Sequence, residues 1–134
     1  MNKELLITKS IEATKLSYSP YSNFKVGAAI LMKDGNIVMG ANIENASYGL
    51  TMCAERNTVF KAMLDGYKKE DMIAMALCAD ADEVPYPCGA CRQVIDELMP
   101  KDAKIIVGNL ENKYMETSIR ELLPYSFNSA NLEK

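Results

Sequence analysis

The chain has 134 residues, of which 49% are hydrophobic and 25% charged, so its length predicts one domain over residues 1–134 with an ordinary globular composition. A chain of this size buries roughly 68% of its unfolded surface, so it needs neither a disulfide nor a metal merely to complete its core. The 15 basic and 18 acidic side chains give a net charge of −3 without a basic block, which argues against nucleic acid or a membrane as a partner.

Two further features of the sequence concern the expected compartment and the available catalytic groups. No apolar run is long enough to span a membrane, and the N-terminus becomes polar too soon for a secretory signal, so we expect a cytoplasmic protein with reduced thiols. The sequence contains no histidine, which excludes Ser-His triads, Cys-His nucleophiles and His-ligated zinc. A proton shuttle must therefore be a carboxylate, a lysine or a tyrosine, and thiolates must hold any soft metal.

The first half of the chain predicts a helix, a loop and a hairpin. The helix covers residues 3–17. Its predicted inward positions are Leu6, Ile7, Ile11, Ala13 and Leu16. Pro20 interrupts this pattern, so residues 18–24 are expected to form an ordered loop. Two apolar runs then flank Asp34 and Gly35, which is typical of an antiparallel hairpin.

The second half predicts alternating helices and strands. A helix from about Cys53 to Asp65 comes first, followed by a buried strand over 72–79 and a helix from Cys88 to before Pro100. A strand over 103–110, a turn at Asn112 into a fifth strand, and a helix over Ser118–Leu123 complete the chain. In the first of these helices, we expect Phe60, Met63 and Leu64 to face inward. The order predicts a three-layer α-β-α fold of the α/β class around a five-stranded mixed sheet.

Three cysteines lie in two short stretches, TMCAER (51–56) and PCGACRQ (87–93). Both stretches fall between a predicted strand and the helix that follows it, and in α/β sheets ligand sites commonly lie at such junctions. Cys88 and Cys91 are three residues apart at a helix start, so both sulfurs face the same way. Cys53 opens the other helix, and helix N-termini favour thiolates. Three thiolates around Zn²⁺ leave one coordination position open, which is the mark of a catalytic site.

Glu55 and Arg56 follow Cys53 directly. Glu55 lies two positions after Cys53, so it does not share the direction of that ligand and can instead carry protons for a zinc-activated water. Zn²⁺ with three thiolates has a net charge of −1, which weakens it as a Lewis acid. The two helix dipoles and Arg56 can offset this charge.

Other interpretations of the cysteines remain open at this stage. Cys88 and Cys91 alone fit a thioredoxin-like redox pair, although this leaves Cys53 and Glu55 unexplained. Cys78 could complete a structural zinc site, but it lies inside an apolar strand and is better interpreted as a core residue. Disulfides are disfavoured by the expected compartment.

Five sequence blocks, in this order, resemble the small homotetrameric cytidine deaminases. They are YSPYSNFKVGAA (18–29), GANIENASY (40–48), CAER (53–56), PCGACRQ (87–93) and ELLPYSF (121–127). The combination of C-A-E with a later P-C-x-x-C is the zinc deaminase pattern. The resemblance implies that Cys53, Cys88 and Cys91 hold one zinc per chain, with Glu55 as the proton shuttle. Asn57 and Thr58 stand where the family often has Thr-Ala, and neither is a proposed contact.

The resemblance also implies a nucleoside site. Phe24 would stack on the pyrimidine, Asn42 and Glu44 would bind the ribose, chiefly its 3′-hydroxyl, and the backbone of Ala54 would meet the base edge. A phenylalanine offers a stacking face, and a carboxylate is the strong acceptor that vicinal sugar hydroxyls require. The alternatives are that Phe24 is a core anchor, Asn42 a turn residue and Glu44 a solvated surface charge.

The same resemblance implies a tetramer with shared sites. Tyr48 and Phe127 would reach into the site of a neighbouring subunit, and Arg56 would bond to ligand thiolates. The expected reaction is the zinc-dependent hydrolysis of cytidine and 2′-deoxycytidine to the uridines and ammonia, in pyrimidine salvage.

Three rivals remain for the function. The first is a deaminase of another nucleoside or analogue such as blasticidin S, which shares C-A-E and P-C-x-x-C but lacks the features at Phe24 and in N-I-E-N. The second is a redox or metal-buffering protein that uses Cys88 and Cys91. The third is an enzyme that edits polynucleotides. The acidic net charge argues against it, and so does the expected binding of the 3′-hydroxyl by Glu44, since a continuous strand has no free hydroxyl there.

Overall fold

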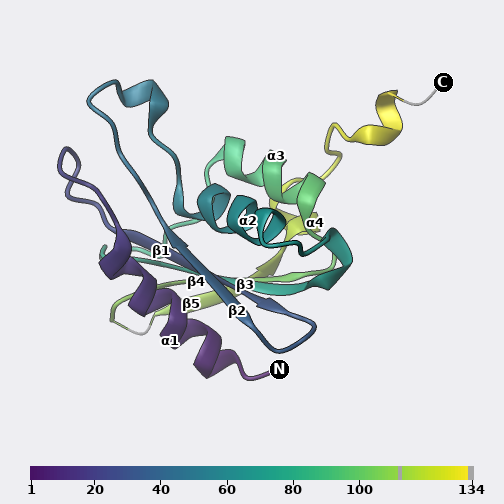
Figure 1. Cartoon of the computed structure of the whole chain (residues 1–134), viewed down its shortest axis with the longest axis horizontal. Coiled ribbons are helices and arrows are strands. Elements are labelled where there is room, and N and C mark those ends of the chain that lie inside the picture. Colours follow the sequence, from purple (N-terminus) through teal and green to yellow (C-terminus); the bar gives the residue numbers. More distant parts are fainter. Residues whose placement is uncertain (112, 133–134) are drawn as a thin grey trace.

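The computed structural model describes residues 1–111 and 113–132 and contains a twisted sheet between helices (Figure 1). The helices are α1 (Lys3–Ala13), α2 (Ala54–Leu64), α3 (Gly89–Leu98) and α4 (Ile119–Leu122). The strands are β1 (Val26–Met32), β2 (Ile37–Ala41), β3 (Met72–Ala79), β4 (Lys104–Asn109) and β5 (Tyr114–Ser118). No helix within these ranges is long and apolar enough to cross a membrane. The turn predicted at Asn112 lies outside the described residues.

The five strands form one mixed sheet, as predicted, and their order across the sheet is β2-β1-β3-β4-β5. β1 is antiparallel to both β2 and β3, and Gly35, with φ of 91°, makes the hairpin turn between β1 and β2. β3 and β4 are parallel and are joined through α3, while β4 and β5 are antiparallel. The carboxyl end of β3 therefore leads directly into the segment that carries Cys88.

Helices cover both faces of the sheet, which gives the predicted three layers. α1 lies on one face, and α2, α3 and α4 lie on the other (Figure 1). Alternate residues of β1 point to opposite layers, because side chains alternate along a strand. Ile30 packs in the core with Val59 and Ile95 from the helices, whereas Ala29 packs with Leu6 of α1.

The predicted inward face of α2 is wrong. Phe60, Met63 and Leu64 are exposed, Leu64 to 87%, whereas smaller side chains face the sheet. The buried positions of α2 are Ala54, Glu55, Thr58, Val59 and Ala62. The prediction followed the bulk of the side chains, but the phase of the helix is set by its first turn, where Ala54 and Glu55 face inward. Leu16 is exposed for a similar reason, since the helix ends at Ala13 and a 3₁₀ turn follows.

Gly27 sets how closely α1 approaches the sheet. A Cβ at this position of β1 would lie 2.4 Å from the carbonyl oxygen of Ser10 and 2.5 Å from the backbone nitrogen of Thr14. Both neighbours are backbone atoms of the α1 segment, so they cannot rotate away as a flexible side chain could. α1 can therefore pack this closely on the sheet only because Gly27 has no side chain.

We expect Gly27→Ala to lower the free energy of unfolding by about 1–3 kcal/mol, because the added methyl group overpacks the contact between α1 and β1. Gly49→Ala is the matched control, since nothing lies within 4 Å of a Cβ there, and it should change stability by less than about 0.5 kcal/mol. Urea unfolding of both variants measures the difference. Equal stabilities of the two variants would contradict this account of the packing.

Candidate metal centre and active site

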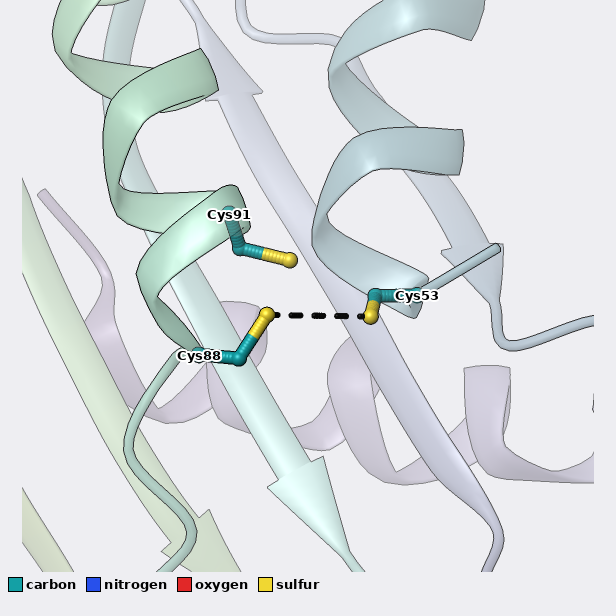
Figure 2. Close-up of side chains that lie close together, drawn as sticks. All are labelled: Cys53, Cys88 and Cys91. Atoms are coloured by element: carbon teal, nitrogen blue, oxygen red, sulfur yellow. Dashed lines mark hydrogen bonds between the residues drawn. The ribbon is translucent and has the colours of Figure 1, made fainter. Parts of the chain in front are cut away.

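The two helix starts that carry the cysteines converge on the same face of the sheet. Cys53 is the N-cap of α2, and Cys88 is the N-cap of α3. Cys91 lies in the first turn of α3, so its sulfur and that of Cys88 point the same way, toward Cys53 (Figure 2). α2 and α3 contact each other, and their N-terminal amides add positive partial charge around the thiols. The sequence thus brings its three predicted ligands together, as expected.

The spacing of the three sulfurs fits a zinc site. All three lie within 4.8 Å of one another, and the sulfurs of Cys53 and Cys88 are 4.0 Å apart. Sulfurs that bind one Zn²⁺ at about 2.3 Å in a tetrahedron lie roughly 3.8 Å apart. All four cysteines are free thiols, and Cys78 is buried in β3 outside this group. Within the described residues, the group therefore offers three ligands, the number typical of catalytic zinc.

The charges around the thiols also call for a cation. A hydrogen bond from Cys91 lowers the pKa of Cys53 to about 5, and the same interaction, together with burial, raises the pKa of Cys91. Deprotonating all three thiols would therefore place like charges side by side in a half-buried site. Arg56 compensates for part of this charge, since its Nη2 donates to Cys53 Sγ at 3.3 Å. A divalent metal would compensate for the rest.

Glu55 lies in the first turn of α2 and faces the same space. Only 5% of the residue is exposed, although it is an acidic residue. Burial raises the pKa of its carboxyl group to about 7, and the nearby charge of Cys53 acts in the same direction. A buried carboxyl group that can gain or lose a proton near neutral pH has the property required of a general acid and base.

A cavity of about 350 Å³ joins the thiols to the predicted nucleoside residues. It is lined by Cys53, Cys88 and Glu55 and by five of the predicted binding residues, namely Phe24, Asn42, Glu44, Tyr48 and Ala54. This volume is in the range of small-molecule sites, which is about 300–1,000 Å³. The cavity is therefore large enough for a ligand that reaches both the thiols and Glu44.

Six further residues line this cavity and were not predicted from the sequence. They are Ser22, Val26, Thr51, Leu77, Pro85 and Tyr86. Val26 and Leu77 are strand residues, and their pattern looks like that of ordinary core positions. Ser22 and Tyr86 had a usable signal, since each lies two residues from a predicted site residue, Phe24 or Cys88.

Asn42 holds the loop that precedes β1. Its Oδ1 accepts from the Ser17 hydroxyl at 2.6 Å and from the Val26 amide at 3.0 Å, and its Nδ2 donates to the Phe24 carbonyl oxygen at 2.8 Å. These bonds link the end of β2 to the segment that carries Phe24. Asn42 is therefore buried and fully engaged on its oxygen, unlike a solvated turn residue.

Glu44 is also buried, with 6% of the residue exposed, so it is not a solvated surface charge. Its Oε1 accepts from the amides of Tyr21 and Ser22 at 3.0 and 3.1 Å, and its Oε2 accepts from the Ser22 hydroxyl. The Ser22 hydroxyl is the largest cause that lowers the pKa of Glu44. The carboxylate is consequently held ionised at the cavity wall.

Phe127 lies apart from this cavity. It is 60% exposed, and the side-chain amide of Gln93 in α3 donates to its carbonyl oxygen at 2.8 Å. Tyr48 is equally exposed and lines the cavity of its own chain. The reach of both residues into a neighbouring subunit stays a prediction.

Comparisons with known proteins agree with this geometry. Residues 1–108 match the family model described as the cytidine and deoxycytidylate deaminase zinc-binding region. A cytidine deaminase from Halalkalibacterium halodurans is 50% identical over 132 residues, which covers 98% of each chain. One from Sporosarcina psychrophila is 44% identical over 98% of this chain and 96% of its own. A crystal structure of cytidine deaminase from Burkholderia pseudomallei superposes with a TM-score of 0.92 at 42% identity, covering 95% of this chain and 100% of the other.

We expect Cys53→Ala, Cys88→Ala and Cys91→Ala each to lose most of the bound zinc, because two thiolates leave the ion with too few ligands. Cys78→Ala is the matched control, since its thiol lies in β3 away from the group. Elemental analysis of the purified proteins should give about one zinc per chain for the parent and for Cys78→Ala. Full zinc in Cys88→Ala, or its loss in Cys78→Ala, would show that the metal lies elsewhere.

Proposed function

The chain belongs to the family of cytidine and deoxycytidylate deaminases, and we propose that it is a zinc-dependent cytidine deaminase. It hydrolyses cytidine and 2′-deoxycytidine to uridine and 2′-deoxyuridine and releases ammonia. One observation carries this proposal: Cys53, Cys88 and Glu55 line the same cavity as Phe24 and Glu44. The cavity thus joins the residue types needed for the reaction to those needed for a nucleoside.

Zinc is the cofactor of this site, held by the thiolates of Cys53, Cys88 and Cys91. When bound, Zn²⁺ supplies Lewis-acid chemistry that makes water acidic enough to lose a proton near neutral pH. The protein keeps the net charge of the centre low through Arg56 and the two helix N-termini.

Glu55 carries the protons of the reaction. Its carboxylate accepts a proton from the water that adds to C4 of the pyrimidine and delivers it to N3. It then transfers the proton of the new hydroxyl group at C4 to the amine, which leaves as ammonia while the C4 carbonyl group of the uridine forms. Burial suits both steps, because a carboxyl group with a pKa of about 7 exchanges protons readily in either direction.

The remaining residues of the cavity hold the nucleoside. Phe24 stacks on the pyrimidine, and the backbone of Ala54 meets the base edge. Asn42 and Glu44 bind the sugar, chiefly at its 3′-hydroxyl. Both polar side chains are already held by hydrogen bonds to the loop before β1, so they lose little conformational entropy when the substrate binds.

The charge of the cavity favours a nucleoside over a nucleotide. Two of its lining residues, Glu44 and Glu55, are acidic, and no lysine or arginine is among the described residues that line it. A phosphate group would meet repulsion there without a cation to pair with. This distinction matters because the family includes enzymes of both kinds.

The wider setting of the enzyme follows from the resemblance. We infer one catalytic domain over residues 1–134 that acts as a homotetramer in the cytoplasm, in pyrimidine salvage. Tyr48 and Phe127 are large exposed side chains, which supports contacts with neighbouring subunits. In that assembly each would complete the site of another subunit.

Three alternatives fit the observations less well. A redox pair of Cys88 and Cys91 gives no role to Cys53 or Glu55. A polynucleotide editor would need a basic groove, whereas this chain has a net charge of −3. A deaminase of another nucleoside, or of blasticidin S, shares the zinc chemistry, and comparison of substrates separates it.

The direct test of the proposal is to mix the purified protein with cytidine and to measure uridine and ammonia, with CMP as the matched substrate. We expect cytidine to react at least about 100-fold more efficiently than CMP, because the acidic cavity offers the phosphate no charged partner. A preference for CMP would instead assign an enzyme that acts on nucleotides. Turnover of blasticidin S but not cytidine would overturn the substrate assignment.

We expect Glu55→Gln to keep its zinc and to lower kcat by about 10²- to 10⁴-fold, because the amide fills the same space but cannot carry a proton. Glu83→Gln is a matched control at an exposed position outside the cavity lining, and it should retain the parent rate. Rates and zinc content are measured on the same samples. Loss of zinc from Glu55→Gln would show that Glu55 supports the metal rather than the protons.

A further inference from the structure

The hydroxyl group of Ser22 lies between two residues of the nucleoside site. It donates to Oε2 of Glu44 and accepts from the backbone amide of Phe24 at 2.9 Å. The backbone amide of Ser22 donates to the other carboxylate oxygen, Oε1, at 3.1 Å. Ser22 also lines the cavity itself. The family resemblance assigned no role to this residue.

The hydrogen bonds of Glu44 limit what its carboxylate can still accept. A carboxylate offers about four acceptor positions, two on each oxygen. Oε1 accepts from the amides of Tyr21 and Ser22, and Oε2 accepts from the Ser22 hydroxyl. Counting the contacts of residues 1–111 and 113–132, this leaves about one acceptor position, on Oε2.

The same count applies to Asn42, which lines the cavity beside Glu44. Its Oδ1 already accepts from Ser17 and Val26, which fills both lone pairs. Its Nδ2 donates one of two hydrogens, to the Phe24 carbonyl oxygen. Within the part of the chain that the structure describes, Asn42 and Glu44 therefore offer about one donor and one acceptor between them.

One donor and one acceptor match a single hydroxyl group, which donates one hydrogen bond and accepts another. We propose that Ser22 is a positioning residue that orients Glu44 so that, with Asn42, it binds one sugar hydroxyl rather than a vicinal pair. This inference rests on the proposed function, and the hydroxyl is the one at the 3′ position. Ser22 acts through Glu44 and does not need to touch the substrate.

The mechanism of positioning follows from which oxygen Ser22 holds. Two amides fix Oε1, but among the described residues only the Ser22 hydroxyl fixes Oε2, the oxygen that keeps a free acceptor position. Without the hydroxyl, Oε2 would gain a second free acceptor position and could swing about the anchored Oε1. The sugar would then meet a less well-oriented acceptor.

The test is a cycle that combines variants of Ser22 with substrates lacking one hydroxyl. The substrates are cytidine, 2′-deoxycytidine and 3′-deoxycytidine. For the parent enzyme, we expect loss of the 3′-hydroxyl to lower kcat/KM by about tenfold to 150-fold, the usual range for a hydrogen bond to a charged group. Loss of the 2′-hydroxyl should change it by less than about threefold, since Asn42 and Glu44 have no further position with which to bind it.

Ser22→Ala should raise KM for cytidine by about tenfold, leave kcat within about twofold, and leave KM for 3′-deoxycytidine nearly unchanged. Ser22→Thr retains the hydroxyl and should restore the parent values. Asn23→Gly is the control for a loosened loop, because Asn23 already has a positive φ of 56° that glycine adopts easily. It should keep the full penalty for a missing 3′-hydroxyl.

The outcomes separate this inference from the proposed function. If the parent enzyme does not deaminate cytidine, the proposed function fails first. If it does, but Ser22→Ala weakens cytidine and 3′-deoxycytidine equally, Ser22 only supports the loop and the inference is wrong. A large penalty for a missing 2′-hydroxyl in the parent enzyme would overturn the count of one hydroxyl.

Discussion

The convergence of two helix N-termini on one point is the constraint on which the rest of the site depends. The sheet order places β3 in the centre, and α2 and α3 lie side by side over the same face. Cys53 and Cys88 cap these helices, so their sulfurs meet at 4.0 Å. Three thiols at this distance cannot all ionise without a compensating cation, because like charges at short range raise one another's pKa. The packing thus forms a site that suits a cation, and the first turn of α2 places Glu55 in the same cavity as Cys53 and Cys88.

A second organising element is the loop of residues 17–25, which joins the start of the chain to the cavity. Asn42 and Glu44 hold this loop through its backbone, and the loop in turn fixes the positions of Phe24 and Ser22. The residues proposed to bind the sugar are therefore also structural. This double role explains why an acidic side chain is buried here, since its charge is compensated by amide and hydroxyl donors.

Much of this could be predicted from the sequence. The element order gave the mixed sheet, and the spacing of Cys88 and Cys91 gave a shared direction for two ligands. The inward face of α2 could not be predicted from hydrophobicity, because the helix presents small side chains such as Ala62 to the sheet and exposes Leu64. The bonds of Ser22 also escaped prediction, since a serine in a polar loop has no pattern that names its partner. Contacts between segments distant in sequence need the fold.

We propose that deamination depends on the metal held by the thiolates of Cys53, Cys88 and Cys91. The most direct measurement strips the protein with a strong chelator, restores zinc in steps, and follows cytidine deamination against bound zinc. We expect activity to rise in proportion to the bound metal and to level off at about one zinc per chain. Full activity in the stripped protein, or no deamination at full zinc occupancy, would contradict it.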